Sequence, residues 1–217
     1  MEQYLTILTG GEGEIIEKRS RFIATVRPVE TEEEANLFWE EMKKKYYDAR
    51  HNCFAFQLKG NPPIVRSSDD GEPSGTAGKP MLEVITGMGL YNIAVVVTRY
   101  FGGTLLGTGG LVRAYTNATK EGILHSEVIE KKQVQKIEVL TDYQDMGKIQ
   151  YLLGNEQIHT FSIDYTENVT LTILVPVNSI ERIKKQLIQC TNGKVGLEDK
   201  EQLYYAMVDK NIMVFDN

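Results

Sequence analysis

Two glycine-rich polar stretches stand on either side of one apolar run, and together they hold most of the residues able to do chemistry. The first stretch spans residues 66–80, the apolar run spans residues 93–97, and the second stretch spans residues 98–115. Glycine permits a positive φ or a close backbone approach, so loops this rich in glycine need a geometric reason. One reason is tight turns; the other is a cradle of backbone N–H groups that binds an anion.

Positively charged side chains in both stretches favour the anion cradle. We expect a groove between Ser67–Lys79 and Phe101–Gly110 in which cations and glycine N–H groups contact phosphates. Tyr100 and Phe101 would either stack on bases there or fill the core at the end of the strand. The candidate anion- or nucleic-acid-binding residues are Arg66, Lys79, Arg99, Gly102, Gly103, Gly109, Gly110 and Arg113.

The two common nucleotide-binding fingerprints do not fit these loops. A P-loop needs a hydroxyl residue after its lysine, but Lys79 is followed by Pro80, and Pro73 stands where the first glycine belongs. A dinucleotide-binding turn needs a third small residue, and the matching position holds Val112. The surviving pattern is a strand, a glycine-rich loop and a helix N-terminus, with Arg113 in the helix.

The acidic residues of the first loop are Asp69, Asp70 and Glu72, and they would bind a hard cation, act as a base or simply form a turn. A structural alternative is that Arg113 pairs with one of the two aspartates and fastens the loops together. His51 and Cys53 share one face of a predicted strand, but no third group completes a nucleophilic site. The sequence therefore indicates no catalytic residue, no metal site and no cofactor; whether the chain is an enzyme stays open, with a binding protein favoured.

The totals restrict the class of protein. The net charge is −6 and the pI is about 5.2, so nonspecific coating of nucleic acid is disfavoured, and any nucleic-acid role must use a local patch. Two cysteines give no disulfide framework. The N-terminal residues lack a secretory signal, and no apolar run approaches the roughly 18 residues that span a bilayer. We therefore expect a cytoplasmic protein that does not contact a membrane.

Residues 1–130 predict a first α+β domain. Tyr4–Leu8 and Gly13–Lys18 are expected to form a hairpin around Gly10 and Gly11. Thr31 is the expected N-cap of a helix whose first turn is acidic and whose last turn is basic. Asn92–Tyr100 is the expected central buried strand, and a helix should begin at Gly109 or Gly110.

Residues 131–217 predict a second domain after a charged connector at Glu127–Lys132. Alternating apolar patterns there give the order βαββαβ, which is that of a ferredoxin-like fold. The tail from Asn211 is expected to be a short added strand or disordered. The expected elements are Val134–Leu140, Tyr143–Leu153, Gln157–Tyr165, Asn168–Val175, Ser179–Cys190 and Glu201–Val208.

Three stretches of the first domain resemble the IMPACT family: Ala49–Ala55, Ser68–Met81 and Val96–Tyr115. The resemblance implies a first domain with the left-handed βαβ fold of a ribosomal protein domain and of domain IV of elongation factor G. It also implies that the second domain is similar to the ferredoxin-like domains of that factor. It supplies no established catalytic residues, so the candidates above rest on their own chemistry.

Eukaryotic members of the family typically carry an added N-terminal domain that binds a ribosome-associated activator of a stress kinase. We do not carry that role over to this sequence. The leading hypothesis is a cytoplasmic factor that contacts RNA or the ribosome, with a further protein partner in translation control, and modulates translation. The alternatives are an enzyme acting on a small phosphorylated or nucleotide substrate in the same groove, and a protein-interaction regulator.

Overall fold

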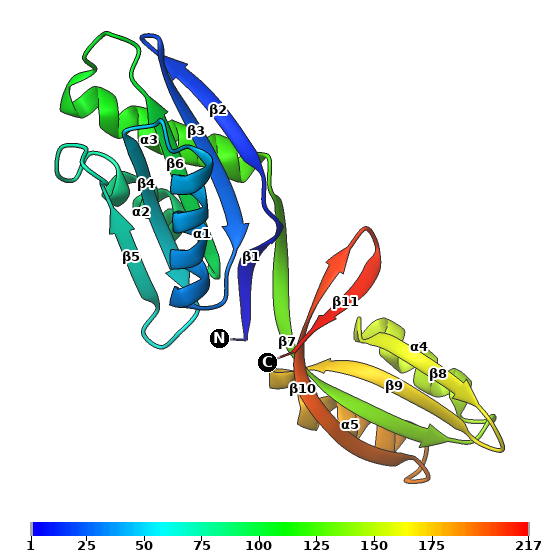
Figure 1. Cartoon of the computed structure of the whole chain (residues 1–217). Helices are drawn as coiled ribbons and strands as arrows, with labels where there is room; N and C mark the ends of the chain where they lie inside the picture. The colour runs from blue at the N-terminus through cyan, green and yellow to red at the C-terminus, as the bar shows by residue number, and fades with distance from the viewer. Residues whose placement is uncertain (1, 217) are drawn as a thin grey trace. The chain divides into compact units, whose positions relative to one another are not determined.

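The computed structural model describes residues 2–216, which divide into two compact units. One unit is Tyr4–Ile129, here called the first unit, and the other consists of residues 2–3 and 130–216, here called the second unit. Each unit has its own sheet and its own helices, so the α+β fold class is confirmed (Figure 1). No helix within residues 2–216 is both long and apolar enough to cross a membrane.

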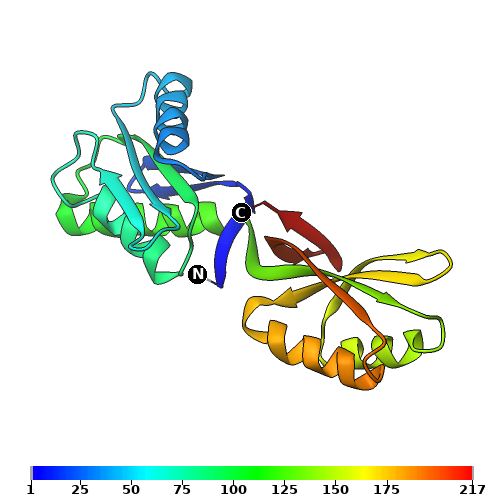
Figure 2. The same cartoon turned by 90° about the horizontal axis from the view of Figure 1, so that it is seen from below.

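The first unit is built around a five-stranded antiparallel sheet in the order β2-β3-β6-β4-β5. Helix α1 covers one face of this sheet, and α2 and α3 cover the other (Figure 2). The strands are β2 (Glu12–Glu17), β3 (Ser20–Pro28), β4 (His51–Leu58), β5 (Ile64–Ser68) and β6 (Ile93–Tyr100), and the helices are α1 (Glu32–Lys45), α2 (Gly78–Gly87) and α3 (Gly107–Leu124).

Strand β6 lies at the centre of this sheet, as the sequence predicts. Val95 and Val97 pack against α2 and α3, whereas Ala94 and Val96 pack toward α1. A strand residue alternates between faces, and helices on both faces bury the whole run. The end of β6, where Arg99 lies, is thus fixed by packing on both sides.

The first helix follows its capping signals. The Thr31 hydroxyl accepts a hydrogen bond from the Glu34 N–H at 3.1 Å, and Ala35, Phe38 and Met42 form the buried stripe. Helix α3, by contrast, begins at Gly107, earlier than the glycines at which the sequence predicts its start.

The predicted hairpin at Gly10 and Gly11 is wrong. Strand β2 pairs with β3 instead, across a two-residue turn in which Lys18 and Arg19 have φ values of 46° and 67°. The two glycines serve close packing, because a Cβ on Gly10 would lie 2.0 Å from the Val26 carbonyl oxygen, and Gly11 is equally crowded. Strand β1 (Gln3–Thr9) pairs with β7 (Glu127–Thr141).

The expected connector at Glu127–Lys132 lies where the chain passes from the first unit to the second, and it forms the first part of β7 instead of a loop. Buried and exposed side chains alternate in this segment, with Ile129 and Lys131 buried and Glu130 exposed, as in a strand with one covered face. A charged stretch without glycine or proline has no turn signal, and strand pairing satisfies its backbone.

The second unit has the predicted βαββαβ order, with β11 added at the end. Its sheet runs β11-β10-β7-β9-β8 with antiparallel neighbours, which is ferredoxin-like, and α4 and α5 share one face (Figure 2). After β7 come α4 (Met146–Asn155), β8 (His159–Tyr165), β9 (Val169–Pro176), a 3-10 turn (Val177–Ser179), α5 (Ile180–Cys190), β10 (Gly196–Val208) and β11 (Asn211–Phe215).

Candidate functional site

In the first glycine-rich loop, backbone N–H groups bind the carboxylate of Asp69, a residue of the same loop. One carboxylate oxygen of Asp69 accepts hydrogen bonds from the Ala77 and Gly78 N–H groups, both at 2.9 Å, and the other accepts from Gly75 at 2.7 Å. Burial acts to raise the pKa of Asp69, but the three donors together hold it below its usual range. Asp69 therefore caps α2 and orders the loop.

The neighbouring Asp70 fastens the same loop to the start of β4. Its carboxylate accepts a hydrogen bond from the Asn52 N–H at 2.7 Å, and its carbonyl oxygen lies 2.9 Å from Nδ1 of His51. Because a carbonyl only accepts, Nδ1 of His51 carries the hydrogen, and Nε2 is the ring nitrogen left for another partner. The contact with the Asp70 carbonyl oxygen orients the His51 ring.

Glu72 reaches into the core and pairs with Arg99. The two side chains are only 3% and 8% exposed, and Oε1 of Glu72 lies 2.6 Å from Nη1 of Arg99. The Tyr115 hydroxyl donates to the same oxygen at 2.9 Å. The loop, the end of β6 and α3 are thus joined through one buried carboxylate.

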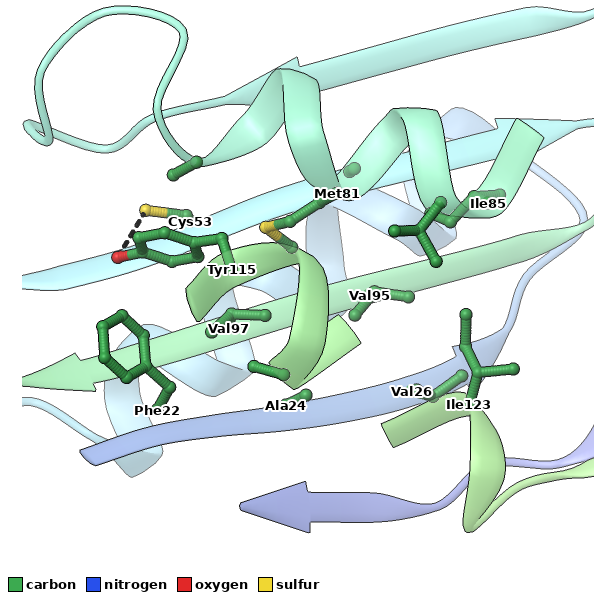
Figure 3. Close-up of a cluster of buried hydrophobic side chains, with 14 of the residues drawn as sticks. Phe22, Ala24, Val26, Cys53, Met81, Ile85, Val95, Val97, Tyr115 and Ile123 are labelled. Carbon is green, nitrogen blue, oxygen red and sulfur yellow. Dashed lines mark hydrogen bonds between the residues drawn. The ribbon is translucent and has the colours of Figure 1, made fainter. Parts of the chain in front are cut away.

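Cys53 extends this network from inside the core. Its thiol donates to the Asp69 carbonyl oxygen at 2.9 Å and lies 3.4 Å from the Tyr115 hydroxyl (Figure 3). The ring of Phe22 meets Tyr115 edge to face, with ring centres 5.2 Å apart. Burial raises the pKa of the Cys53 thiol well above its usual range, so the thiol stays protonated. The side chains of His51 and Cys53 therefore do not contact each other as a pair: Cys53 lies in the core, and His51 contacts Asp70.

A cavity of about 570 Å³ lies where β4 begins and β6 ends, and its lining is mostly polar or aromatic. Arg99 forms part of its wall, and Nε of Arg99 is buried without a hydrogen-bond partner among residues 2–216. Phe101 is 55% exposed, and Asp48 accepts a hydrogen bond from the Tyr100 hydroxyl at 2.8 Å. The lining residues are Asp48, Arg50, His51, Arg99, Tyr100, Phe101 and Leu105.

The second glycine-rich loop borders this cavity and leads into α3. Gly102 packs directly on the β2–β3 turn, because a Cβ there would lie 2.1 Å from the Arg19 carbonyl carbon. Gly103 has a φ of +82° and open space around it. Helix α3 has no side-chain cap among the described residues, and Gly109 and Gly110 stand in its first turn. By contrast, the first N–H groups of α2 donate to the Asp69 carboxylate.

Arg113 lies near this helix start but not at the cavity that Arg99 lines. It borders a smaller hollow of about 110 Å³ with Lys18 and Gly110, and it forms no ion pair within the described chain. The alternative that Arg113 fastens the loops through Asp69 or Asp70 has no such contact to support it, since those carboxylates accept backbone N–H groups.

The remaining sequence candidates lie elsewhere on the first unit. Arg66 is exposed on β5 with Nε 3.7 Å from Glu32, and Lys79 is exposed on α2, 4.0 Å from Glu83. Among residues 2–216 no group of three or more His, Cys, Asp or Glu side chains is arranged to hold a metal ion.

Four residues that sequence reasoning passed over belong to this region: Lys18, Arg19, Arg50 and Asp48. Lys18 and Arg19 were not predicted as turn residues because the hairpin was expected eight residues earlier. Arg50 stands beside His51 in the motif that begins at Ala49, and this neighbouring position could have identified it as a candidate.

Comparisons with known proteins agree with this fold. A family model described as the Impact N-terminal domain matches residues 18–123, and one described as a domain of unknown function (DUF1949) matches residues 139–194. The IMPACT family member YvyE of Bacillus subtilis is 40% identical over 204 residues, which cover 94% of each chain. The chain belongs to the IMPACT family.

Two solved structures extend the comparison. One, described as a hypothetical protein, is 33% identical with a TM-score of 0.59 and covers 93% of this chain and 98% of its own. Another, described as the two-domain translational regulator Yih1, is 28% identical over 54% of this chain and 47% of its own. Its TM-score of 0.39 is too low to support a structural comparison.

Proposed function

We propose that this protein is a factor that contacts RNA, free or within the ribosome, and thereby modulates translation. Membership of the IMPACT family supports a role in translation control, and the surface around the second glycine-rich loop supports contact with RNA. The observation that carries the proposal is a set of four exposed cations around that loop: Lys18, Arg19, Arg50 and Arg113.

The four cations lie around one loop because their segments border it from different sides. Gly102 lies on the backbone of Arg19 and donates its N–H to the Ser20 hydroxyl at 3.1 Å. Lys18 and Arg113 line one hollow beside the start of α3. Arg50 lines the cavity that Phe101 and Leu105 border from the loop.

These cations are available to a ligand. None of the four has a hydrogen bond or ion pair to another side chain in residues 2–216, unlike Arg21, which is paired with Glu14. The acids that line the two hollows are Glu17 and Asp48, and Glu72 is balanced by Arg99, so cations outnumber acids there in a chain whose net charge is −6. A local positive patch on an acidic protein is what contact with phosphates requires.

Exposed aromatic and glycine residues suit single-stranded RNA in particular. Phe101 offers a ring on which a base stacks, and the uncapped first turn of α3 offers N–H groups to a phosphate. Arg66 and Lys79, which lie near acidic partners, would then contribute through general attraction only.

The test is RNA binding across a salt series, with co-sedimentation on ribosomal subunits as the second assay. Arg113→Gln should weaken binding and flatten the slope of log affinity against log salt by about 0.7, the value for one single-strand phosphate contact. The matched control is Lys185→Gln, which removes the same charge from an exposed, unpaired site in the second unit. Binding by Arg113→Gln that equals the wild type at every salt concentration, or no binding to RNA or ribosomes at all, would overturn the proposal.

A further inference from the structure

Arg99 lies in an environment that is unusual for a purely structural arginine. Its guanidinium is held by Glu72 through Nη1 at 2.6 Å, and Glu72 is itself fixed by the Tyr115 hydroxyl. Nε of the same group is buried and lacks a partner among the described residues, although its side chain forms cavity wall. Leaving a buried donor without a partner is unfavourable, and an acceptor that reached Nε from the cavity after a small side-chain movement would offset that cost.

Two other side chains that line the cavity, those of Arg50 and His51, also have nitrogen atoms without a hydrogen-bond partner in the described chain. Arg50 has no hydrogen bond or ion pair within residues 2–216, and His51 keeps Nε2 for a ligand because Nδ1 donates to the Asp70 carbonyl oxygen. Two guanidinium groups and one imidazole thus converge on one cavity. The oxygens of a phosphate match such forked donors in both charge and geometry.

The rest of the lining suits a nucleoside attached to that phosphate. The ring of Phe101 lies 5.7 Å from Cζ of Arg99 and is more than half exposed, so a base can stack beside the phosphate position. Asp48 accepts one hydrogen bond from Tyr100 and keeps acceptor capacity for ribose hydroxyls, as acidic residues do in nucleotide sites. A volume of about 570 Å³ is within the range of small-ligand pockets.

From these observations we infer that the cavity binds one ribonucleoside monophosphate unit. Its phosphate contacts Arg50, His51 and Arg99, its ribose contacts Asp48, and its base stacks on Phe101. Two sources carry this chemistry: a free ribonucleotide, or the 5′-phosphorylated end of an RNA chain. The second source rests on the proposed function, whereas the first does not.

The experiment titrates the full chain with AMP, dAMP and inorganic phosphate, and with one RNA sequence carrying either a 5′-phosphate or a 5′-hydroxyl. AMP should bind. Phe101→Ala should lower the affinity for AMP about 5- to 150-fold, which is the contribution of one base stacked on an aromatic ring. Arg50→Gln should weaken it about tenfold or more, as loss of one charge-assisted contact does. Lys185→Gln should bind like the wild type. AMP should bind more tightly than dAMP, and Asp48→Asn should remove that difference.

The outcomes separate this inference from the proposed function. A preference for the 5′-phosphorylated RNA that Arg50→Gln abolishes supports both. Equal binding of both RNAs, without AMP binding, overturns the inference and leaves the proposed function standing. AMP binding without RNA binding supports the inference with the free nucleotide as ligand and overturns the proposed function. Inorganic phosphate that binds as tightly as AMP overturns the nucleotide assignment.

Discussion

Replacing Glu72 by glutamine should destabilise the first unit strongly. The substitution keeps an oxygen that accepts from Tyr115, so the main change is loss of the charge that offsets Arg99. Removing one partner of a buried ion pair costs about 3–5 kcal/mol, because the other charge stays buried and unpaired. The side chains of Glu72 and Arg99 are only 3% and 8% exposed, so water offers little compensation.

The expected change in melting temperature follows from the size of the first unit, Tyr4–Ile129. At about 2.1 cal/mol/K per residue, its unfolding entropy is about 0.26 kcal/mol/K, so the melting temperature should fall by about 11–19 °C. Differential scanning calorimetry of the full chain measures this fall, and the transition that moves identifies the first unit.

Two further variants make the test sharp. Glu14→Gln breaks the exposed pair with Arg21 and should change the melting temperature little, since solvent screens that pair. Combining Glu72→Gln with Arg99→Met should recover much of the loss, because no unpaired charge remains. If Glu72→Gln lowers the melting temperature no more than Glu14→Gln, the buried pair does not hold the loop as described.

Four other predictions concern the same chain. Gly109→Ala should stabilise α3 by about 0.5–1 kcal/mol in denaturant titrations. It should also weaken RNA binding, because the added methyl group would lie 3.9 Å from Nη1 of Arg113, where a phosphate is expected; unchanged binding would show that no phosphate approaches the backbone there. The lowered pKa of Asp69 means that its stabilisation is present above about pH 3.9 and is lost as pH falls through the folded-state pKa; acid melts of Asp69→Asn should lack that loss. Cys53 should react with Ellman's reagent more slowly than Cys190, because burial raises the pKa of its thiol and seals it in the core; equal rates would contradict this. A fragment of residues 131–217 should melt cooperatively, and a molten product would show that the units depend on each other.

The elements that follow local signals could be predicted from the sequence. The Thr31 cap, the apolar run of β6 and the alternating patterns of the second unit each lie within a few neighbouring residues. A continuous apolar run indicates a strand that is buried on both faces, and this predicted the central position of β6. The family motifs contain Asp69, Glu72, Arg99 and Tyr115, which form the polar network of the first unit.

The contacts that define the site join residues far apart in the chain, and local patterns do not encode them. Arg99 was expected at a phosphate, but its contact with Glu72, which lies 27 positions earlier, could not be predicted from the sequence. Asp69 was considered as a metal ligand or a base, but it caps a helix that begins nine positions later. The pair Gly10 and Gly11 is typical of a turn, but glycine is needed at both positions because other backbone segments pack closely against them. Only the folded arrangement distinguishes these roles.

The most direct measurement of the RNA contact is photo-cross-linking. Single-stranded RNA containing 4-thiouridine is irradiated with the full chain, and the cross-linked peptides are identified by mass spectrometry. An RNA contact at the second glycine-rich loop predicts cross-links at Phe101 or nearby in residues 99–105, reduced in Arg113→Gln and unchanged in Lys185→Gln. Cross-links confined to the second unit, or spread equally over the chain and unaffected by Arg113→Gln, would contradict it.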